Sequence, residues 1–322
     1  MTRYRHALPQ LSRGPFITDG GLETTLVFLE GIDLPCFAAF PLVLTEEGRG
    51  QLTRYFAPYL AEAARRGAGI VLDTPTWRAN ADWGAKLGYG PDWLSEVNRL
   101  SVEYVASLRD AHEPLTGPIV INGVVGPRGD GYQVGATMDP VEAERYHALQ
   151  AEAFRDGAAD MMSAITMTYA GEAIGIARAA RGCGLPVAIS FTLETDGRLP
   201  SGQSLKDAIA QTDAATGGYP AYYMINCAHP EHFEAILDGG AWLDRIGGLR
   251  ANASRKSHAE LDAATELDIG DPAELGGQYR ALRTSLRRLC VLGGCCGTDH
   301  RHIRAICEAC LPEEPPRLRA AG

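Results

Sequence analysis

Long apolar stretches are missing from this sequence of 322 residues. No run of about 18 apolar residues occurs, which argues against a membrane-spanning helix, and residues 1–10 lack the apolar core of a signal peptide. Basic residues are in the minority, with 30 Lys and Arg against 40 Asp and Glu, and they form no stripe that would neutralise phosphates. We therefore expect a cytoplasmic protein with small-molecule partners, which binds neither nucleic acid nor a membrane.

Two further absences bear on the fold. A Gly-rich phosphate loop does not follow the first apolar segment, where Asp19-Gly20-Gly21-Leu22-Glu23 stands instead, so a doubly wound nucleotide-binding sheet is disfavoured. No linker or change of composition divides the chain. The 45% hydrophobic composition suffices for one large core, and barrels of the α/β type reach this length as a single unit.

Short apolar segments recur along the chain and indicate strands. They are continuously apolar, as strands buried on both faces of a parallel sheet need to be. They cover residues 15–18, 69–73, 118–122, 161–166, 186–191, 221–226, 246–251 and 289–292. Amphipathic segments between them indicate helices at residues 45–66, 93–111, 139–155, 172–181, 205–214, 230–237, 272–288 and 299–310. The alternation predicts a single (β/α)8 TIM barrel over residues 1–310, followed by a flexible C-terminal tail over residues 311–322.

The placement of the cysteines is more informative than their number, which is eight. Because the cytosol keeps thiols reduced, we expect no disulfides. Cys227 ends the sixth predicted strand, and the adjacent Cys295 and Cys296 follow the eighth, so all three lie at the end of the barrel that carries the chemistry in this fold. Glycines at positions 293, 294 and 297 are expected to turn the backbone sharply, so that the two neighbouring side chains reach one point.

Three thiolates at one point predict a zinc ion with an open coordination position. Three protein ligands are typical of a catalytic rather than a structural zinc site. Three thiolate charges make zinc a weak Lewis acid toward water, while it still binds and deprotonates a soft thiol. We therefore predict that a zinc-bound thiolate attacks the methyl group of a sulfonium or ammonium donor, and we assign no separate protein base.

Each cysteine motif also has a simpler interpretation. Cys227 alone suits a packed core residue, and the adjacent pair suits a vicinal disulfide or a redox pair. Cys307 and Cys310 resemble half of a zinc site but fall within a predicted helix, so we expect them to be structural. The same role is expected for Cys36, Cys183 and Cys290. A non-catalytic barrel that stores zinc or responds to redox state therefore stays open as an alternative.

Several motifs together resemble the zinc-dependent homocysteine S-methyltransferase family, which includes betaine and S-methylmethionine utilising enzymes. These motifs are Asp19-Gly20-Gly21, Asn226-Cys227, Gly293-Gly294-Cys295-Cys296-Gly297-Thr298 and His302-Ile303. The resemblance extends from Phe16 to Ile306 and implies a barrel that methylates homocysteine in methionine biosynthesis. It implies zinc on the three cysteines at positions 227, 295 and 296.

The resemblance also assigns residues to the acceptor. It implies that Asp19, with the backbone of Gly20 and Gly21, holds the amino-acid end of a homocysteine-like thiol. It implies that Asn226 lies beside the first zinc ligand. By itself, Asp19 would equally suit a turn or a helix cap.

The end of the fourth predicted strand departs from the family. Similar enzymes carry there an acidic residue, followed by Thr or Tyr, whose carboxylate contacts the amino group of the substrate. This sequence has Ile165 and then Thr166. Glu194, after the fifth strand, is our candidate for the missing charge, with a solvated surface role as the alternative. The acceptor is therefore homocysteine or a related thiol, and the alternative function is a zinc-dependent transferase or lyase acting on a different thiol or a selenol.

Aromatic residues near the strand ends are candidates for the donor site, because aromatic rings bind sulfonium and quaternary ammonium groups. Trp77 follows the second strand and Tyr132 the third, and either would equally suit loop packing. Arg78 and Arg128 are candidates to pair with a substrate carboxylate, with surface solvation as the alternative. We predict neither the donor nor the oligomeric state.

Overall fold

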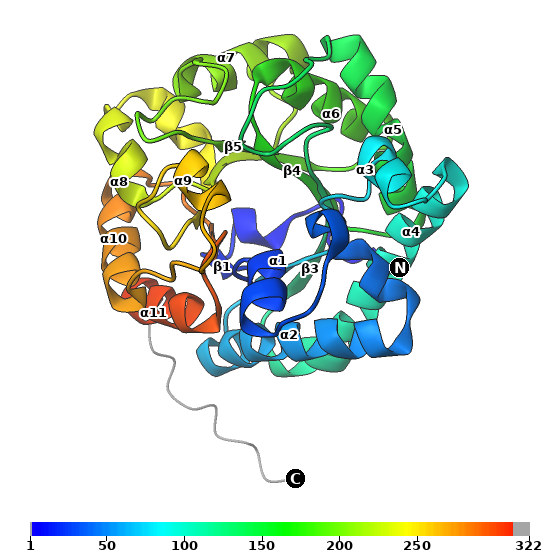
Figure 1. Ribbon diagram of the computed structural model, residues 1–322. Coiled ribbons are helices and arrows are strands. Elements are labelled where there is room, and N and C mark those ends of the chain that lie inside the picture. Colours follow the sequence, from blue (N-terminus) through cyan, green and yellow to red (C-terminus); the bar gives the residue numbers. More distant parts are fainter. Residues whose placement is uncertain (1, 312–322) are drawn as a thin grey trace, which may run out of the picture.

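Eight parallel strands close into a barrel in their sequence order (Figure 1). The strands are β1 Phe16–Ile17, β2 Ile70–Asp73, β3 Ile119–Val125, β4 Met161–Met167, β5 Val187–Thr192, β6 Tyr222–Asn226, β7 Ile246–Ala251 and β8 Val291–Gly294. This computed structural model describes residues 2–311, so the flexible tail predicted for 311–322 lies, apart from its first residue, outside the described residues. Every strand overlaps the apolar segment predicted for it, and the (β/α)8 barrel is confirmed.

Helices form the outer layer around the barrel (Figure 1). The α-helices are α1 Leu22–Thr24, α2 Glu46–Arg66, α3 Ala81–Lys86, α4 Pro91–His112, α5 Pro140–Asp156, α6 Ala170–Gly182, α7 Leu205–Thr216, α8 Pro230–Phe233, α9 His258–Asp262, α10 Pro272–Ser285 and α11 His300–Cys310. Side chains cap the amino-terminal ends of two long helices: the Thr45 side chain accepts a hydrogen bond from Gly48 N–H before α2, and Asp139 caps α5. The short α1, α3 and α9, of 3, 6 and 5 residues, were not predicted because they are too short to show a helical period.

The interior of the barrel is filled by apolar side chains at its amino-terminal end. Phe16, Val71, Val120, Met161 and Tyr222 point inward from their strands and are all buried. This packing leaves room for a ligand only toward the carboxyl ends of the strands, as is usual for this fold. Among residues 2–311, no helix has both the length and the apolar character needed to cross a membrane.

Candidate metal centre

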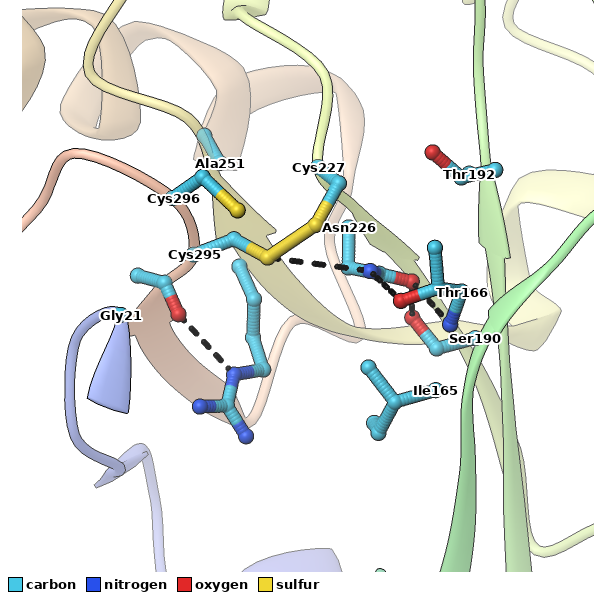
Figure 2. Close-up of a disulfide and its surroundings, with 12 residues drawn as sticks. Gly21, Ile165, Thr166, Ser190, Thr192, Asn226, Cys227, Ala251, Cys295 and Cys296 are labelled. Atoms are coloured by element: carbon cyan, nitrogen blue, oxygen red, sulfur yellow. Dashed lines mark hydrogen bonds between the residues drawn. A yellow bond between two sulfur atoms is a disulfide. The ribbon is translucent and has the colours of Figure 1, made fainter. Parts of the chain in front are cut away.

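The three predicted metal-ligating cysteines meet at the mouth of the barrel. Cys227 directly follows β6, Cys295 and Cys296 directly follow β8, and β7 lies between these two strands. One ligand atom from each of the three cysteines lies within 4.8 Å of the others (Figure 2). Within the described part of the chain, no other group of three or more His, Cys, Asp or Glu residues converges in this way.

Strand β7 and the loop after it hold both cysteine segments in place. The Cys227 N–H donates to the carbonyl of Arg250 at 3.1 Å, and the Cys295 N–H donates to the carbonyl of Ala251 at 2.9 Å. The carbonyl of Cys296 accepts from Ala253 N–H at 3.2 Å. Cys227 has a φ of 52°, in the left-handed region that non-glycine residues rarely adopt. The thiols are therefore positioned by backbone hydrogen bonds to one shared segment.

The glycines of the cysteine loop have two different roles. Gly297 has a φ of 78° and makes the sharp turn that the sequence predicts. That prediction is wrong for Gly293 and Gly294, which belong to β8 and have no positive φ. A Cβ on Gly294 would lie 2.0 Å from the hydroxyl oxygen of Thr298, and one on Gly293 would lie 2.3 Å from a methyl group of Thr18. These two glycines are needed because neighbouring segments approach closely.

Cys227 and Cys295 are joined by a disulfide, whereas Cys296 is free (Figure 2). The expectation that the chain forms no disulfide is therefore wrong, and the bond is not the vicinal one between adjacent cysteines. Thiols that converge on one point are also placed to be oxidised. Both residues become available as metal ligands once the disulfide is reduced.

The buried side-chain amide of Asn226, the last residue of β6, lies beside a sulfur atom and contacts the end of β4. The Asn226 Oδ1 accepts hydrogen bonds from Thr166 N–H at 3.0 Å and from the Ser190 hydroxyl at 2.6 Å (Figure 2). Its Nδ2 donates to Thr166 Oγ1 at 3.0 Å and lies 3.9 Å from Cys295 Sγ. Thr166 has a φ of 68°, which is strained for a β-branched residue. Asn226 thus fixes both the strained end of β4 and the surroundings of one thiol.

Tyr132 supports the third thiol. Its hydroxyl lies 3.1 Å from Cys296 Sγ, and its ring stacks on His258 with ring centroids 4.0 Å apart. The His258 Nε2 contacts the Cys227 carbonyl at 2.7 Å, and its Nδ1 lies 3.1 Å from a carboxylate oxygen of Glu194. Burial raises the pKa of the Cys296 thiol to about 11. Glu194 therefore contacts His258 rather than any of the three cysteine sulfur atoms.

A cavity of about 380 Å³ opens in front of the three cysteines. Its lining includes Asp19, Gly20, Gly21, Glu23, Asp73, Trp77, Arg78, Tyr132, Ile165, Thr166 and Arg250. Glu194 and Asn226 are not among the lining residues. The sequence analysis did not single out Asp73, Arg250 and Glu23, which are among the charged residues of this lining. Asp73 and Arg250 lie within apolar strands and Glu23 in a very short helix, so no motif singled them out.

Arg250 neutralises the carboxylate that was predicted to hold the acceptor. Its Nη2 donates to Asp19 Oδ1 at 2.5 Å, its Nη1 to Asp73, and its Nε to the Gly294 carbonyl at 3.1 Å. The other Asp19 oxygen accepts from the Tyr55 hydroxyl at 2.9 Å. Burial raises the pKa of Asp19, and the positive charge of Arg250 opposes that rise. Asp19 therefore already has a cationic partner within the protein.

Gly20 and Gly21 pack the first loop against the cysteine loop. A Cβ added to Gly20 would lie 2.6 Å from the Thr298 carbonyl oxygen, and one added to Gly21 would lie 2.6 Å from that of Cys295. The Gly21 N–H donates to the Thr298 carbonyl at 2.9 Å. Larger residues at these two positions would push the loops apart. A packing role thus accounts for both glycines.

The remaining candidates divide between the cavity and the surface. The guanidinium of Arg78 lies 4.1 Å from the ring centroid of Trp77 and 3.7 Å from that of Trp83, so one face of Trp77 is covered. Arg128 forms ion pairs with Asp82 and Glu142 at 2.9 and 3.0 Å, and these side chains are largely exposed. The structure brings Trp77 and Arg78 into the cavity lining but leaves Arg128 outside it.

Comparisons with known proteins agree with this geometry. The fold is similar to that of the Escherichia coli homocysteine methyltransferase MmuM in its oxidized form, at 20% identity and a TM-score of 0.73, over 92% of this chain and 96% of that one. The metallated form of MmuM matches at 21% identity and a TM-score of 0.70, with the same coverage. A search of curated proteins gave no match. The sequence model of the family described as homocysteine S-methyltransferase matches residues 16–310. The chain therefore belongs to the homocysteine S-methyltransferase family.

Proposed function

We propose that this protein is a zinc-dependent S-methyltransferase in which Cys227, Cys295 and Cys296 hold the metal. The observation that supports this most directly is the convergence of the three sulfur atoms within 4.8 Å at the barrel mouth. Three thiolates form a donor set that suits zinc and leaves a fourth position for a substrate. Reduction of the bond between Cys227 and Cys295 precedes metal binding in this proposal.

When bound, zinc would supply the positive charge that keeps an acceptor thiol deprotonated near neutral pH. The protein residues tune the charge of the sulfur ligands. The Tyr132 hydroxyl is placed to donate to Cys296, and the Asn226 amide lies beside Cys295. Such partners draw electron density from a thiolate and fix its direction, and their loss typically costs about 10–100-fold in metal affinity or activity.

The walls of the cavity suit a reaction in which opposite charges disappear. A thiolate that takes a methyl group from a sulfonium or ammonium donor becomes a neutral thioether, and the donor becomes neutral as well. An apolar environment favours this change because it stabilises separated charges poorly. Phe28, Phe37, Trp77, Leu261 and Leu267 supply apolar lining around the cysteines. The acidic Asp130, Asp262 and Glu266 lie in the same lining and would attract a cationic donor.

The part of the cavity lined by Ile165, Asp19 and Arg250, here called its amino-acid end, supports a second candidate. This candidate is a zinc-dependent enzyme that acts on a thiol or selenol other than homocysteine. Ile165 offers no charge, and Asp19 is paired with Arg250. Both candidates use the same metal centre. They differ only in the substrate: homocysteine accepts a methyl group in the first candidate, and a different thiol or a selenol reacts in the second.

Product analysis separates these candidates. Reduced, zinc-supplied protein is incubated with homocysteine and, in turn, S-methylmethionine, S-adenosylmethionine and betaine, and the products are identified by mass spectrometry. We expect methionine with at least one donor, and no methionine from the Cys296→Ala variant. The absence of methionine with all three donors, in protein that holds one zinc ion, would favour the second candidate.

A further inference from the structure

The amino-acid end of the cavity lacks a free carboxylate at both positions where the family resemblance places one. Position 165 is an isoleucine, and Asp19 is held by Arg250, Tyr55 and Thr18. All three guanidinium nitrogens of Arg250 already donate hydrogen bonds. An α-amino acid brought to this cavity therefore needs other partners for its ammonium and carboxylate groups.

Glu23 is a carboxylate in the cavity lining that has no such partner. Its side chain makes no ion pair or side-chain hydrogen bond with another residue of the described chain, and it is only half-buried. It lies in α1, whose preceding residue Gly21 packs on Cys295, while the Thr24 hydroxyl accepts from Gly297 N–H at 3.3 Å. The glutamate is thus carried by a segment that is fastened to the cysteine loop.

Arg78 is a cation in the same lining. It is only 7% exposed, and its guanidinium lies over the rings of Trp77 and Trp83, which fixes its direction. Its Nη1 donates to the Gly129 carbonyl at 3.0 Å, but its buried Nε has no hydrogen-bond partner. Within residues 2–311 no carboxylate forms an ion pair with it, although Asp130 and Glu23 line the same cavity and their charges act on it.

The two charges influence one another without being joined. Burial raises the pKa of Glu23 to about 7 and lowers that of Arg78 to about 10, and the charge of each group partly opposes the shift of the other. Asp130 also opposes the shift of Arg78, yet Glu23 and Arg78 form no ion pair. An α-amino acid carries opposite charges a few bond lengths apart, so it can satisfy both groups at once. Glu23 and Arg78 line the same cavity as Cys296, and the charge of Glu23 contributes to the raised pKa of that thiol.

We infer that Glu23 and Arg78 form the subsite that binds the ammonium and carboxylate groups of an amino-acid thiol acceptor. The inference rests on the proposed function for the position of the acceptor sulfur, but not for the recognition of the head group. Glu23 takes the place of the acidic residue that similar enzymes carry at position 165. Arg78 gives the carboxylate a charge-assisted partner.

The test measures binding rather than turnover, so it does not depend on the methyl donor. Isothermal titration calorimetry compares L-methionine with 4-(methylthio)butanoate, which lacks the amino group, and 3-(methylthio)propylamine, which lacks the carboxylate. The unmodified protein should bind L-methionine at least about 10-fold more tightly than either analogue, as expected for hydrogen bonds to charged groups. In Glu23→Gln, L-methionine should no longer bind more tightly than 4-(methylthio)butanoate. In Arg78→Met, it should no longer bind more tightly than 3-(methylthio)propylamine.

Control variants separate recognition from general effects of charge. Glu30→Gln makes the same chemical change at an exposed position outside the cavity lining and should leave all three affinities unchanged. The double variant Glu23→Gln/Ile165→Glu returns a carboxylate to position 165 and should restore discrimination in favour of the amino group. Unchanged discrimination in both Glu23→Gln and Arg78→Met would overturn the inference. So would weakened binding of S-methylmethionine alone, since the pair would then serve the donor. Failure of methyl transfer with intact discrimination would count against the proposed function only.

Discussion

The two ends of the cavity differ in how closely they follow the family. At the sulfur end, all three cysteines stand at the ends of β6 and β8, and the intervening β7 holds them together. At the amino-acid end, Ile165 stands where the family resemblance implies an acidic residue, and Arg250 forms ion pairs with both Asp19 and Asp73. In the proposed mechanism, sulfur activation and head-group recognition therefore fall to different loops of one barrel, so that either can change without the other.

Removal of one sulfur ligand should affect the sulfur end of the cavity most strongly. Cys227→Ala, Cys295→Ala and Cys296→Ala should each abolish stoichiometric zinc and lower methyl transfer at least about 100-fold, since loss of supporting groups alone costs up to about that much. Zinc content is measured by atomic absorption in reduced protein. Cys183→Ala is the control: this half-buried cysteine does not belong to the proposed metal centre, so the variant should keep both zinc and activity. Near-normal turnover in any of the three variants would contradict the proposed metal centre.

The amino-acid end can be tested through the stability of its ion pairs. Arg250→Met leaves Asp19 and Asp73 as buried carboxylates without a cation and should lower the free energy of unfolding by about 3–5 kcal/mol. Urea unfolding measures the change. Lys206→Met removes an exposed pair with Asp238 and should cost less than about 1 kcal/mol. A similar small loss in both variants would mean that Arg250 does not balance the two carboxylates.

Asn226 joins the two ends, because it contacts both Thr166 and Cys295. Asn226→Ala should destabilise the protein by about 1–3 kcal/mol, since it leaves the buried N–H of Thr166 without its partner. Ser190→Ala, which removes a single donor to the same amide, should cost less. Thermal unfolding of both variants provides the measurement. An equal loss in the two variants would argue that the amide does not hold the strained end of β4.

The smallest expected effect concerns the pH dependence of head-group binding. Burial raises the pKa of Glu23 to about 7, so its carboxylate is charged above that pH and neutral below it. L-methionine should therefore bind up to about 10-fold more tightly at pH 8 than at pH 6 in reduced, metal-free protein. Between these values Arg78, with a pKa lowered to about 10, and Cys296, with one raised to about 11, keep their protons. Asp19 stays paired with Arg250. An equally steep dependence in Glu23→Gln would contradict the assignment.

The sequence predicts the sulfur end better than the amino-acid end, for physical reasons. Strands buried on both faces are continuously apolar, so their ends, and the cysteines at 227, 295 and 296, are visible in the sequence. Arg250 and Asp73 lie within such strands, and nothing local shows that Arg250 pairs with both Asp73 and Asp19. Glu23 is in a helix of 3 residues, which has no period to detect. The disulfide depends on how closely two distant loops approach, which chain position does not reveal.

Zinc K-edge X-ray absorption on the reduced, zinc-loaded protein counts the sulfur ligands of the proposed metal centre. We expect three sulfur neighbours at about 2.3 Å together with one lighter atom, because three cysteines leave one position open. Addition of the acceptor thiol should raise the count to four sulfurs. A centre with fewer than three protein sulfurs, or one whose sulfur count stays the same when a thiol that the enzyme methylates is added, would contradict this expectation.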